Sequence, residues 1–151
     1  MATWKDVERS EPEFADRVRK IFDANKHKTL ATLRADGAPR ISGTECSFAD
    51  GELTFGSMPR SRKGADLLRD PRFALHSATV DAPDGDDAAW VGDAKVAGRA
   101  FHAGDVDGDI EGDLFRADLD QVVLIGLNET ATMMVIRTWT PAGGLRTVER
   151  T

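Results

Sequence analysis

Three short β-prone runs, joined by two Asp-Gly turns, occupy residues 27–57 and constrain the fold more than any other feature of the sequence. The runs read KTLATLR, PRISGTECSF and ELTFGS, and each turn reads ADG. An Asp-Gly turn between runs of this length is typical of an antiparallel hairpin, because the turn needs residues that tolerate a positive φ. We therefore predict a meander of three consecutive antiparallel strands.

The rest of the sequence predicts further strands and few helices. Ser10 and Glu13 form a capping-box pattern ahead of a helix that ends near Lys26, and residues 61–70 form a short helix that ends before Pro71. Further strands are predicted in the runs RFALHSATV, DAKVAGRAFH, QVVLIGLN and TATMMVIRTW. Because helical crossovers do not recur between these runs, the expected fold is mainly β, a barrel of six or seven antiparallel strands with a few helices.

A chain of 151 residues with 40% hydrophobic residues is expected to form one domain with a single core. Its parts are an N-terminal helix (1–26), barrel strands (27–80), an acidic insert and strand (81–120), and final strands with a tail (121–151). The first residues are too charged for a signal peptide, and no apolar run is long enough to span a membrane, so a cytoplasmic location is expected. Cys46 is the one cysteine, which excludes an internal disulfide.

Acidic residues dominate the insert. Twelve acidic and three basic residues lie between Asp81 and Asp120, and the formal net charge of the whole chain is −6. A surface of this sign repels nucleic acid and anionic lipid, so neither is expected as a partner. Any binding site for an anion must therefore lie in a local cluster of basic residues.

The segment PRSRKGADLLRDPR, residues 59–72, is such a local exception, because it holds five basic and two acidic side chains. Ser61 is predicted to cap the short helix, which leaves the first backbone N–H groups of the helix facing outward. Together with the side chains of Arg62 and Lys63, these groups would form a compact phosphate-binding site. The alternative is a solvent-exposed basic face that binds nothing.

Arg40 begins the strand RISGTECSF, whose hairpin partner ELTFGS leads into the basic segment. Pairing of these two runs would bring Arg40 near Gly56 and Ser57. Side chains alternate along a strand, so Ser42 and Thr44 are expected on the same side as the arginine. We therefore predict a polar strip beside the phosphate site, with an arginine that reaches solvent from the strand end as the alternative.

The order of the motifs DG-PR-I-S, LTFGS, SRK, DPRFAL and DAKVAGRA resembles the pyridoxamine 5′-phosphate oxidase-like FMN-binding split β-barrel family, within the flavin/deazaflavin oxidoreductase superfamily. The resemblance covers residues 27–102 well and the last strands loosely. It implies a split barrel and a homodimer that holds FMN, or the deazaflavin coenzyme F-420, in a groove at the subunit interface.

The resemblance also implies a set of cofactor-binding residues. They are Arg40, Ile41, Ser42, Gly56, Ser57, Ser61, Arg62 and Lys63. Arg40 and the SRK motif would contact the cofactor phosphate, and the backbone after Arg40 would contact the isoalloxazine ring. Asp93 stands where the oxidases carry a glutamine, and the tail WTPAGGLRTVERT lacks the histidine with which true pyridoxamine 5′-phosphate oxidases bind the substrate phosphate.

The expected function is that of a flavin- or deazaflavin-dependent oxidoreductase that transfers a hydride to or from a small organic substrate. The missing histidine argues against a true pyridoxamine 5′-phosphate oxidase. No catalytic residue is predicted, because the cofactor itself carries the redox chemistry. The alternative is a non-catalytic protein that carries a flavin, a deazaflavin or haem on the same barrel.

No metal site is expected. The segment DGDIEGDLFRAD, residues 107–118, imitates a calcium-binding loop, but glutamate is unusual at its fifth position and aspartate replaces the bidentate glutamate at its twelfth. The three histidines, His27, His76 and His102, show no close ligand spacing, which disfavours zinc. A haem ligand among them is the alternative.

Overall fold

The computed structural model describes residues 2–106 and 111–151, over which the chain forms nine strands, three α-helices and one short 3₁₀ helix. The strands are β1 (Lys28–Leu33), β2 (Pro39–Thr44), β3 (Cys46–Ala49), β4 (Glu52–Ser57), β5 (Arg72–His76), β6 (Asp93–Asp105), β7 (Asp113–Leu127), β8 (Met134–Thr140) and β9 (Gly144–Arg150). The helices are α1 (Trp4–Ser10), α2 (Pro12–Asp23), α3 (Arg62–Arg69) and the 3₁₀ helix η1 (Asp87–Ala89). Among the residues so described, no helix is long and apolar enough to cross a lipid bilayer.

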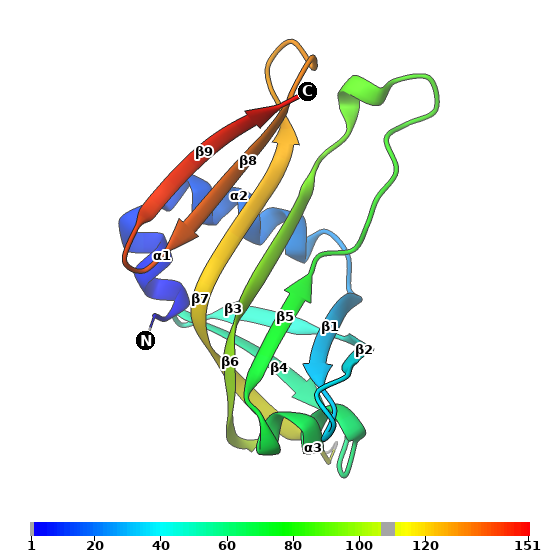
Figure 1. Cartoon of the computed structure of the whole chain (residues 1–151), viewed down its shortest axis with the longest axis vertical. Coiled ribbons are helices and arrows are strands. Elements are labelled where there is room, and N and C mark those ends of the chain that lie inside the picture. The colour runs from blue at the N-terminus through cyan, green and yellow to red at the C-terminus, as the bar shows by residue number, and fades with distance from the viewer. Residues whose placement is uncertain (1, 107–110) are drawn as a thin grey trace.

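The strands pair in antiparallel fashion, and seven of them follow the order β2-β1-β5-β6-β7-β4-β3 (Figure 1). The two strands at the ends of this series, β2 and β3, are consecutive in the chain and separated by Glu45 alone. The chain itself therefore joins the two edges of the sheet, which curls into a barrel. At this junction the hydroxyl of Thr44 donates to the carbonyl of Gly56 on β4 at 3.3 Å. The mainly-β barrel predicted from the sequence is confirmed.

β6 and β7 are the two longest strands and run the length of the molecule (Figure 1). Each of them also pairs with a further strand of the sheet. The first part of β7 pairs with β4 and its last part pairs with β8. β8 and β9 form a hairpin that extends the sheet beyond the barrel and lies next to α1, where the indole N–H of Trp139 donates to the hydroxyl of Ser10 at 3.1 Å. One end of β7 thus belongs to the barrel and the other to this extension.

Apolar side chains from the barrel and from both N-terminal helices form one core. α2 is amphipathic, and Phe14, Val18 and Phe22 on its inner face are buried. Trp4 of α1 and Phe22 both pack against Phe48 of β3, with ring centroids 4.6 and 5.5 Å apart. Because burial of a large apolar side chain contributes about 1.5–3 kcal/mol, these contacts hold both helices against the sheet.

The N-terminal region differs from the single helix predicted over 1–26. It forms two helices, α1 and α2, and the second begins at Pro12, a residue that is well tolerated at the first position of a helix. The predicted capping box at Ser10 is wrong, because that residue ends α1. The capping box belongs to Thr3 and Asp6, which exchange backbone and side-chain hydrogen bonds at 2.8 and 3.3 Å.

Three strand predictions also differ from the structure. The run PRISGTECSF is divided at Glu45, so β2 pairs with β1 and only β3 pairs with β4. The predicted acidic insert contains the first half of β7, which begins at Asp113, and the predicted tail contains β9. The calcium-loop pattern of residues 107–118 begins outside the described part of the chain.

Candidate functional site

A pocket of about 580 Å³ opens beside the junction of β2 and β3. Residues of β4, of the start of β7 and of the first turn of α3 also form its wall. Among the lining residues are His27, Gly43, Cys46, Gly56, Ser57 and Lys63. Pockets for small ligands and cofactors typically measure about 300–1,000 Å³, so this pocket has the size of a cofactor site.

Polar groups converge where β4 ends and α3 begins. Ser61 caps α3, and its Oγ accepts a hydrogen bond from the backbone N–H of Gly64 at 3.0 Å. The hydroxyl of Ser57, the last residue of β4, lies 2.6 Å from the hydroxyl of Ser61. The first N–H groups of a helix have no partner within the helix, so those of Arg62 and Lys63 are available to an anion at this end.

Gly64 allows the two serine hydroxyls to lie this close to the helix. A Cβ atom at this position would lie 2.8 Å from Oγ of Ser57 and 3.0 Å from Oγ of Ser61. At least one of the hydroxyls would then have to rotate away. Because residue 64 has no side chain, both serine hydroxyls can remain beside the first turn of α3.

Lys63 reaches from α3 to the neighbouring strand β2. Its Nζ donates to the carbonyl of Gly43 at 3.0 Å, and both residues line the pocket. Partial burial lowers the pKa of the Lys63 ammonium from its ordinary value, because desolvation disfavours the charged form. Among the described residues no carboxylate forms an ion pair with it. A half-buried cation without an acidic partner is a strong attractor for a phosphate.

Arg40 does not lie where the predicted hairpin would place it. Because β2 pairs with β1, Arg40 lies opposite Thr32, and neither Gly56 nor Ser57 is its cross-strand neighbour. Its Nε donates to Oδ2 of Asp66 at 2.7 Å, so the arginine is bound to the second turn of α3. No partner is found for its terminal amino groups in the described part of the chain, which leaves them available to a ligand.

Asp66 is a buried acid that connects α3 to two strands. Its side chain is 3% exposed and accepts hydrogen bonds from Thr32, Arg40 and Arg69 at 2.7–2.9 Å. Burial by itself raises the pKa of this carboxyl, but the three hydrogen bonds outweigh that effect and hold the pKa below its ordinary value of 3.8. The carboxylate therefore fixes the helix whose N-terminus borders the pocket.

The structure brings together five of the predicted cofactor-binding residues near the start of α3. Gly56, Ser57 and Lys63 line the pocket. Ser61 contacts Ser57 at its edge, and Arg62 is exposed on the first turn of the helix. The basic segment thus has the predicted helix cap and faces a pocket, whereas contact of these residues with a cofactor is still a prediction.

On β2 the predicted alternation of side chains is present. Arg40 and Ser42 are half-buried and Thr44 is buried, whereas Ile41 between them is 75% exposed. Thr44 lines the pocket, but Arg40, Ile41 and Ser42 do not. The polar strip therefore exists, but its two earlier residues, Arg40 and Ser42, lie along β2 away from the pocket lining.

Two lining residues, His27 and Cys46, were not predicted to lie here. His27 is exposed and directly precedes β1, and Cys46 begins β3. Burial raises the pKa of the Cys46 thiol to about 11, so the thiol is neutral near pH 7 and is not an activated nucleophile. The sequence carries no signal for their proximity, because it depends on the division of the strand at Glu45.

The curled antiparallel sheet, with a cluster of hydrogen-bond donors beside a cofactor-sized pocket, defines the class of the protein as a small β-barrel. The chain belongs to the pyridoxamine 5′-phosphate oxidase family, whose sequence model matches residues 14–110. The matched region contains α3 and the strands from β1 to β6, so the resemblance seen in the sequence is confirmed. No curated protein matches the sequence.

Solved structures with low sequence identity share the fold. PhzG from Burkholderia lata 383, in complex with tetrahydrophenazine-1-carboxylic acid, is 14% identical, with a TM-score of 0.67 over 93% of this chain and 92% of that chain. A pyridoxamine 5′-phosphate oxidase-related, FMN-binding protein from Nostoc punctiforme is 11% identical, with a TM-score of 0.63 over 93% and 96%. A haem-binding protein from Mycobacterium smegmatis is 14% identical, with a TM-score of 0.59 over 89% and 86%. At these identities the likeness shows the fold alone.

Proposed function

We propose that the protein is an FMN-dependent oxidoreductase that binds the cofactor phosphate at the N-terminus of α3. The observation that carries this proposal is the convergence of donors at one edge of a cofactor-sized pocket. Ser57 and Ser61 supply hydroxyls, the start of α3 supplies backbone N–H groups, and Lys63 supplies a half-buried positive charge. This combination matches the geometry and charge that a phosphate monoester requires.

Two arginines add to the fit of the site to a phosphate. Arg62 is exposed on the first turn of α3, where a cation and the positive end of the helix dipole act in the same direction on an anion. Arg40 binds Asp66 through Nε, and its amino groups can donate to a ligand beside the same helix. The residues present therefore fit the phosphate of FMN.

FMN supplies hydride transfer when bound, and the protein supplies binding, orientation and exclusion of water. Phe55, Met58 and Leu114 line the pocket and offer apolar surface to an aromatic ring. The deazaflavin coenzyme F-420 carries the same type of phosphate, so the donors at α3 suit it equally. We take FMN as the cofactor to test first, since an FMN-binding protein shares the fold. The substrate is a small organic molecule that exchanges a hydride with the bound ring.

The same proposal includes a homodimer in which the second subunit covers the pocket. Met58 lines the pocket and is 77% exposed, and Ile41 on the edge strand β2 is 75% exposed. Large exposed apolar side chains of this kind are what a partner subunit would cover in the proposed dimer. The substrate would then enter between the two subunits.

Haem is a second candidate ligand, because one histidine lines the pocket. His27 is exposed at the pocket wall, and neutral imidazole is a common axial ligand of haem iron. A haem-binding protein from Mycobacterium smegmatis shares the fold. In this case the protein would carry haem without redox turnover of an organic substrate.

The decisive experiment is a titration of the purified protein with FMN, with coenzyme F-420 and with haemin. Quenching of cofactor fluorescence measures the first two, and the Soret absorbance measures the third. We expect FMN to bind, and we expect Lys63→Ala to weaken binding about 10- to 100-fold, because a charge-assisted hydrogen bond to the phosphate is lost. Lys95→Ala, which removes an exposed cation on β6, is the matched control and should bind FMN like the wild type.

Each alternative predicts a different result of this titration. Binding of F-420 without binding of FMN would identify the deazaflavin, and not FMN, as the cofactor. Binding of haemin that His27→Ala abolishes, without binding of either flavin, would establish the haem carrier. Equal FMN affinity of the wild type and Lys63→Ala would contradict the phosphate site at α3. Turnover of a hydride acceptor by the reduced cofactor then separates an enzyme from a flavin carrier.

A further inference from the structure

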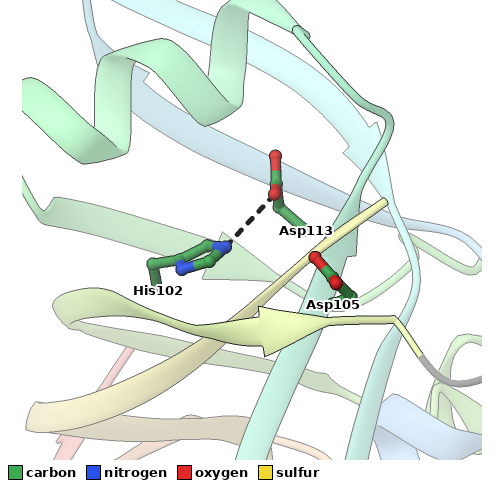
Figure 2. Close-up of side chains that lie close together, drawn as sticks. All are labelled: His102, Asp105 and Asp113. Atoms are coloured by element: carbon green, nitrogen blue, oxygen red, sulfur yellow. Dashed lines mark hydrogen bonds and ion pairs between the residues drawn. The ribbon is translucent and has the colours of Figure 1, made fainter. Parts of the chain in front are cut away.

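We propose that His102, Asp105 and Asp113 form a binding site for a divalent transition-metal ion at the ends of β6 and β7. Figure 2 shows the three side chains gathered on one side of the strand pair. Nε2 of His102 lies 3.1 Å from Oδ1 of Asp113, and ligand atoms of all three residues lie within 4.8 Å of one another. This site lies outside the lining of the cofactor pocket, and neither the family match nor the expected cofactor accounts for it.

An irregularity of β6 brings the three residues together. Side chains three positions apart in a regular strand point to opposite faces, so His102 and Asp105 would be separated. The register with β7 shifts between His102 and Gly104, where Gly104 has a φ of +116°, and this bulge re-aims the strand. Asp105 then lies opposite Asp113. Bulges are found beside functional sites because they redirect single side chains in this way.

The charges around the group favour a cation. Asp105 and Asp113 place two carboxylates close together, and among the residues described neither forms an ion pair with a lysine or arginine. Within the described residues their one ion-pair partner is His102, whose imidazole bears a charge only when it is protonated. A divalent ion would relieve the repulsion between the carboxylates with neutral imidazole as a third ligand.

The donor set identifies the class of metal. One imidazole nitrogen with two carboxylate oxygens suits Zn²⁺ and its first-row neighbours, whereas Ca²⁺ and Mg²⁺ prefer oxygen ligands alone. Two ligands of one zinc ion lie about 3.0–3.4 Å apart when each metal bond is about 2.1 Å. The observed spread of up to 4.8 Å needs a small side-chain rotation, and the side chains of His102 and Asp113 are 41% and 33% exposed and therefore able to rotate. Three protein ligands leave further positions for water or a small anion.

A metal ion bound at this position would affect the structure of the cofactor pocket. Asp113 is the cross-strand partner of Ser57, and the next residue, Leu114, is the partner of Gly56. Ser57, Gly56 and Leu114 all line the pocket. A metal that ties the end of β6 to the start of β7 would therefore hold the strand that supports one wall of the cofactor pocket.

A second histidine pair in the same molecule provides a matched control. Nε2 of His76 on β5 lies 4.0 Å from Oδ2 of Asp93 on β6, which is a similar pairing of imidazole and carboxylate. Within the described residues no third carboxylate, cysteine or histidine joins that pair in a metal-binding arrangement. Substitution of His76 should therefore leave metal binding unchanged.

The test is calorimetric titration of the cofactor-free, tag-free protein with ZnCl₂, followed by titration with CoCl₂ monitored by visible absorbance. We expect one Zn²⁺ per chain and a Co²⁺ absorption band in the wild type. The variants His102→Gln and Asp113→Asn should each lower the Zn²⁺ affinity by at least about tenfold, because each removes a ligand. His76→Gln should bind like the wild type.

Three results would overturn the proposal. They are no saturable Zn²⁺ binding by the wild type, unchanged affinity in the variant that lacks His102, Asp105 and Asp113 together, and equal loss in His76→Gln. Circular dichroism of each variant checks that the barrel is intact, which is expected because the substituted side chains are not buried in the core. The FMN-site variant Lys63→Ala should retain the metal site, so failure of one site is distinguishable from failure of the other.

Discussion

Arg40 and Asp66 are joined by a hydrogen-bonded ion pair of 2.7 Å between β2 and α3, with only 15% and 3% of the two side chains exposed. The pair connects a strand at the edge of the barrel to the helix whose N-terminus faces the pocket. Because α3 contains only eight residues, its position depends on such tertiary contacts more than on intrinsic helix stability. Asp66, one of the two acids in the basic segment, thus holds Arg40 and Arg69 beside α3.

Replacement of Asp66 by asparagine should destabilise the protein by about 3 kcal/mol, because removal of one partner leaves the charge of Arg40 uncompensated in a largely buried place. Urea unfolding followed by circular dichroism measures the change. The exposed pair of Arg19 and Asp23, with side chains 47% and 48% exposed, supplies the control. Asp23→Asn should change the free energy of unfolding by less than about 0.5 kcal/mol. Similar losses in the two variants would contradict the role assigned to Asp66.

The same carboxylate should make stability depend on pH in the acid range. The pKa of Asp66 in the folded protein is lower than its ordinary value of 3.8, so the folded state binds fewer protons at this site than the unfolded state. Its contribution is fully present above about pH 4 and is lost as the pH falls through the folded pKa. The difference in unfolding free energy between wild type and Asp66→Asn should therefore be constant from about pH 7 to 5 and shrink near pH 3. A difference that grows toward acid pH would refute this assignment.

A methyl group at residue 64 should disturb ligand binding without loss of stability. In Gly64→Ala the new Cβ would meet the hydroxyls of Ser57 and Ser61, and these would rotate away from each other. Alanine favours a helix by about 1 kcal/mol over glycine, which offsets the local cost. We expect FMN affinity to fall about tenfold and the melting temperature to stay close to that of the wild type. Gly126→Ala is the control, because no atom of the described residues, other than those of Gly126 and its two chain neighbours, lies within 4 Å of a Cβ placed there.

If a second subunit covers the pocket, a charge on the exposed edge of β2 should separate the subunits. Ile41→Glu places a carboxylate at a side chain that is 75% exposed in the single chain. We expect sedimentation velocity to show a dimer for the wild type and a monomer for this variant, because an unpaired charge is costly in an apolar interface. Val148→Glu on β9, where the side chain is 47% exposed, should remain a dimer. A monomeric wild type would remove the dimer from the proposed function.

Much of the barrel and part of the site could be predicted from local signals. The Asp-Gly turn at Gly37 joins β1 to β2, and the one at Gly51 joins β3 to β4, as expected from the positive φ of both glycines. Ser61 caps α3 and Asp70 ends it ahead of proline, because these effects depend only on neighbouring residues. The first half of β7 could not be predicted from the sequence, because its acidic residues obscure the alternation of buried and exposed side chains. In that alternation Phe115 is buried.

The sequence by itself therefore determined the antiparallel strands, the capped helix and the basic segment, because turn chemistry, alternation and capping act over a few residues. The tertiary structure decided which of these groups meet. The break at Glu45 sends β2 to β1 and turns Arg40 toward Asp66, and the bulge in β6 turns Asp105 toward His102 and Asp113. Strand partners and bulges depend on contacts between segments far apart in the chain, and no short motif encodes them.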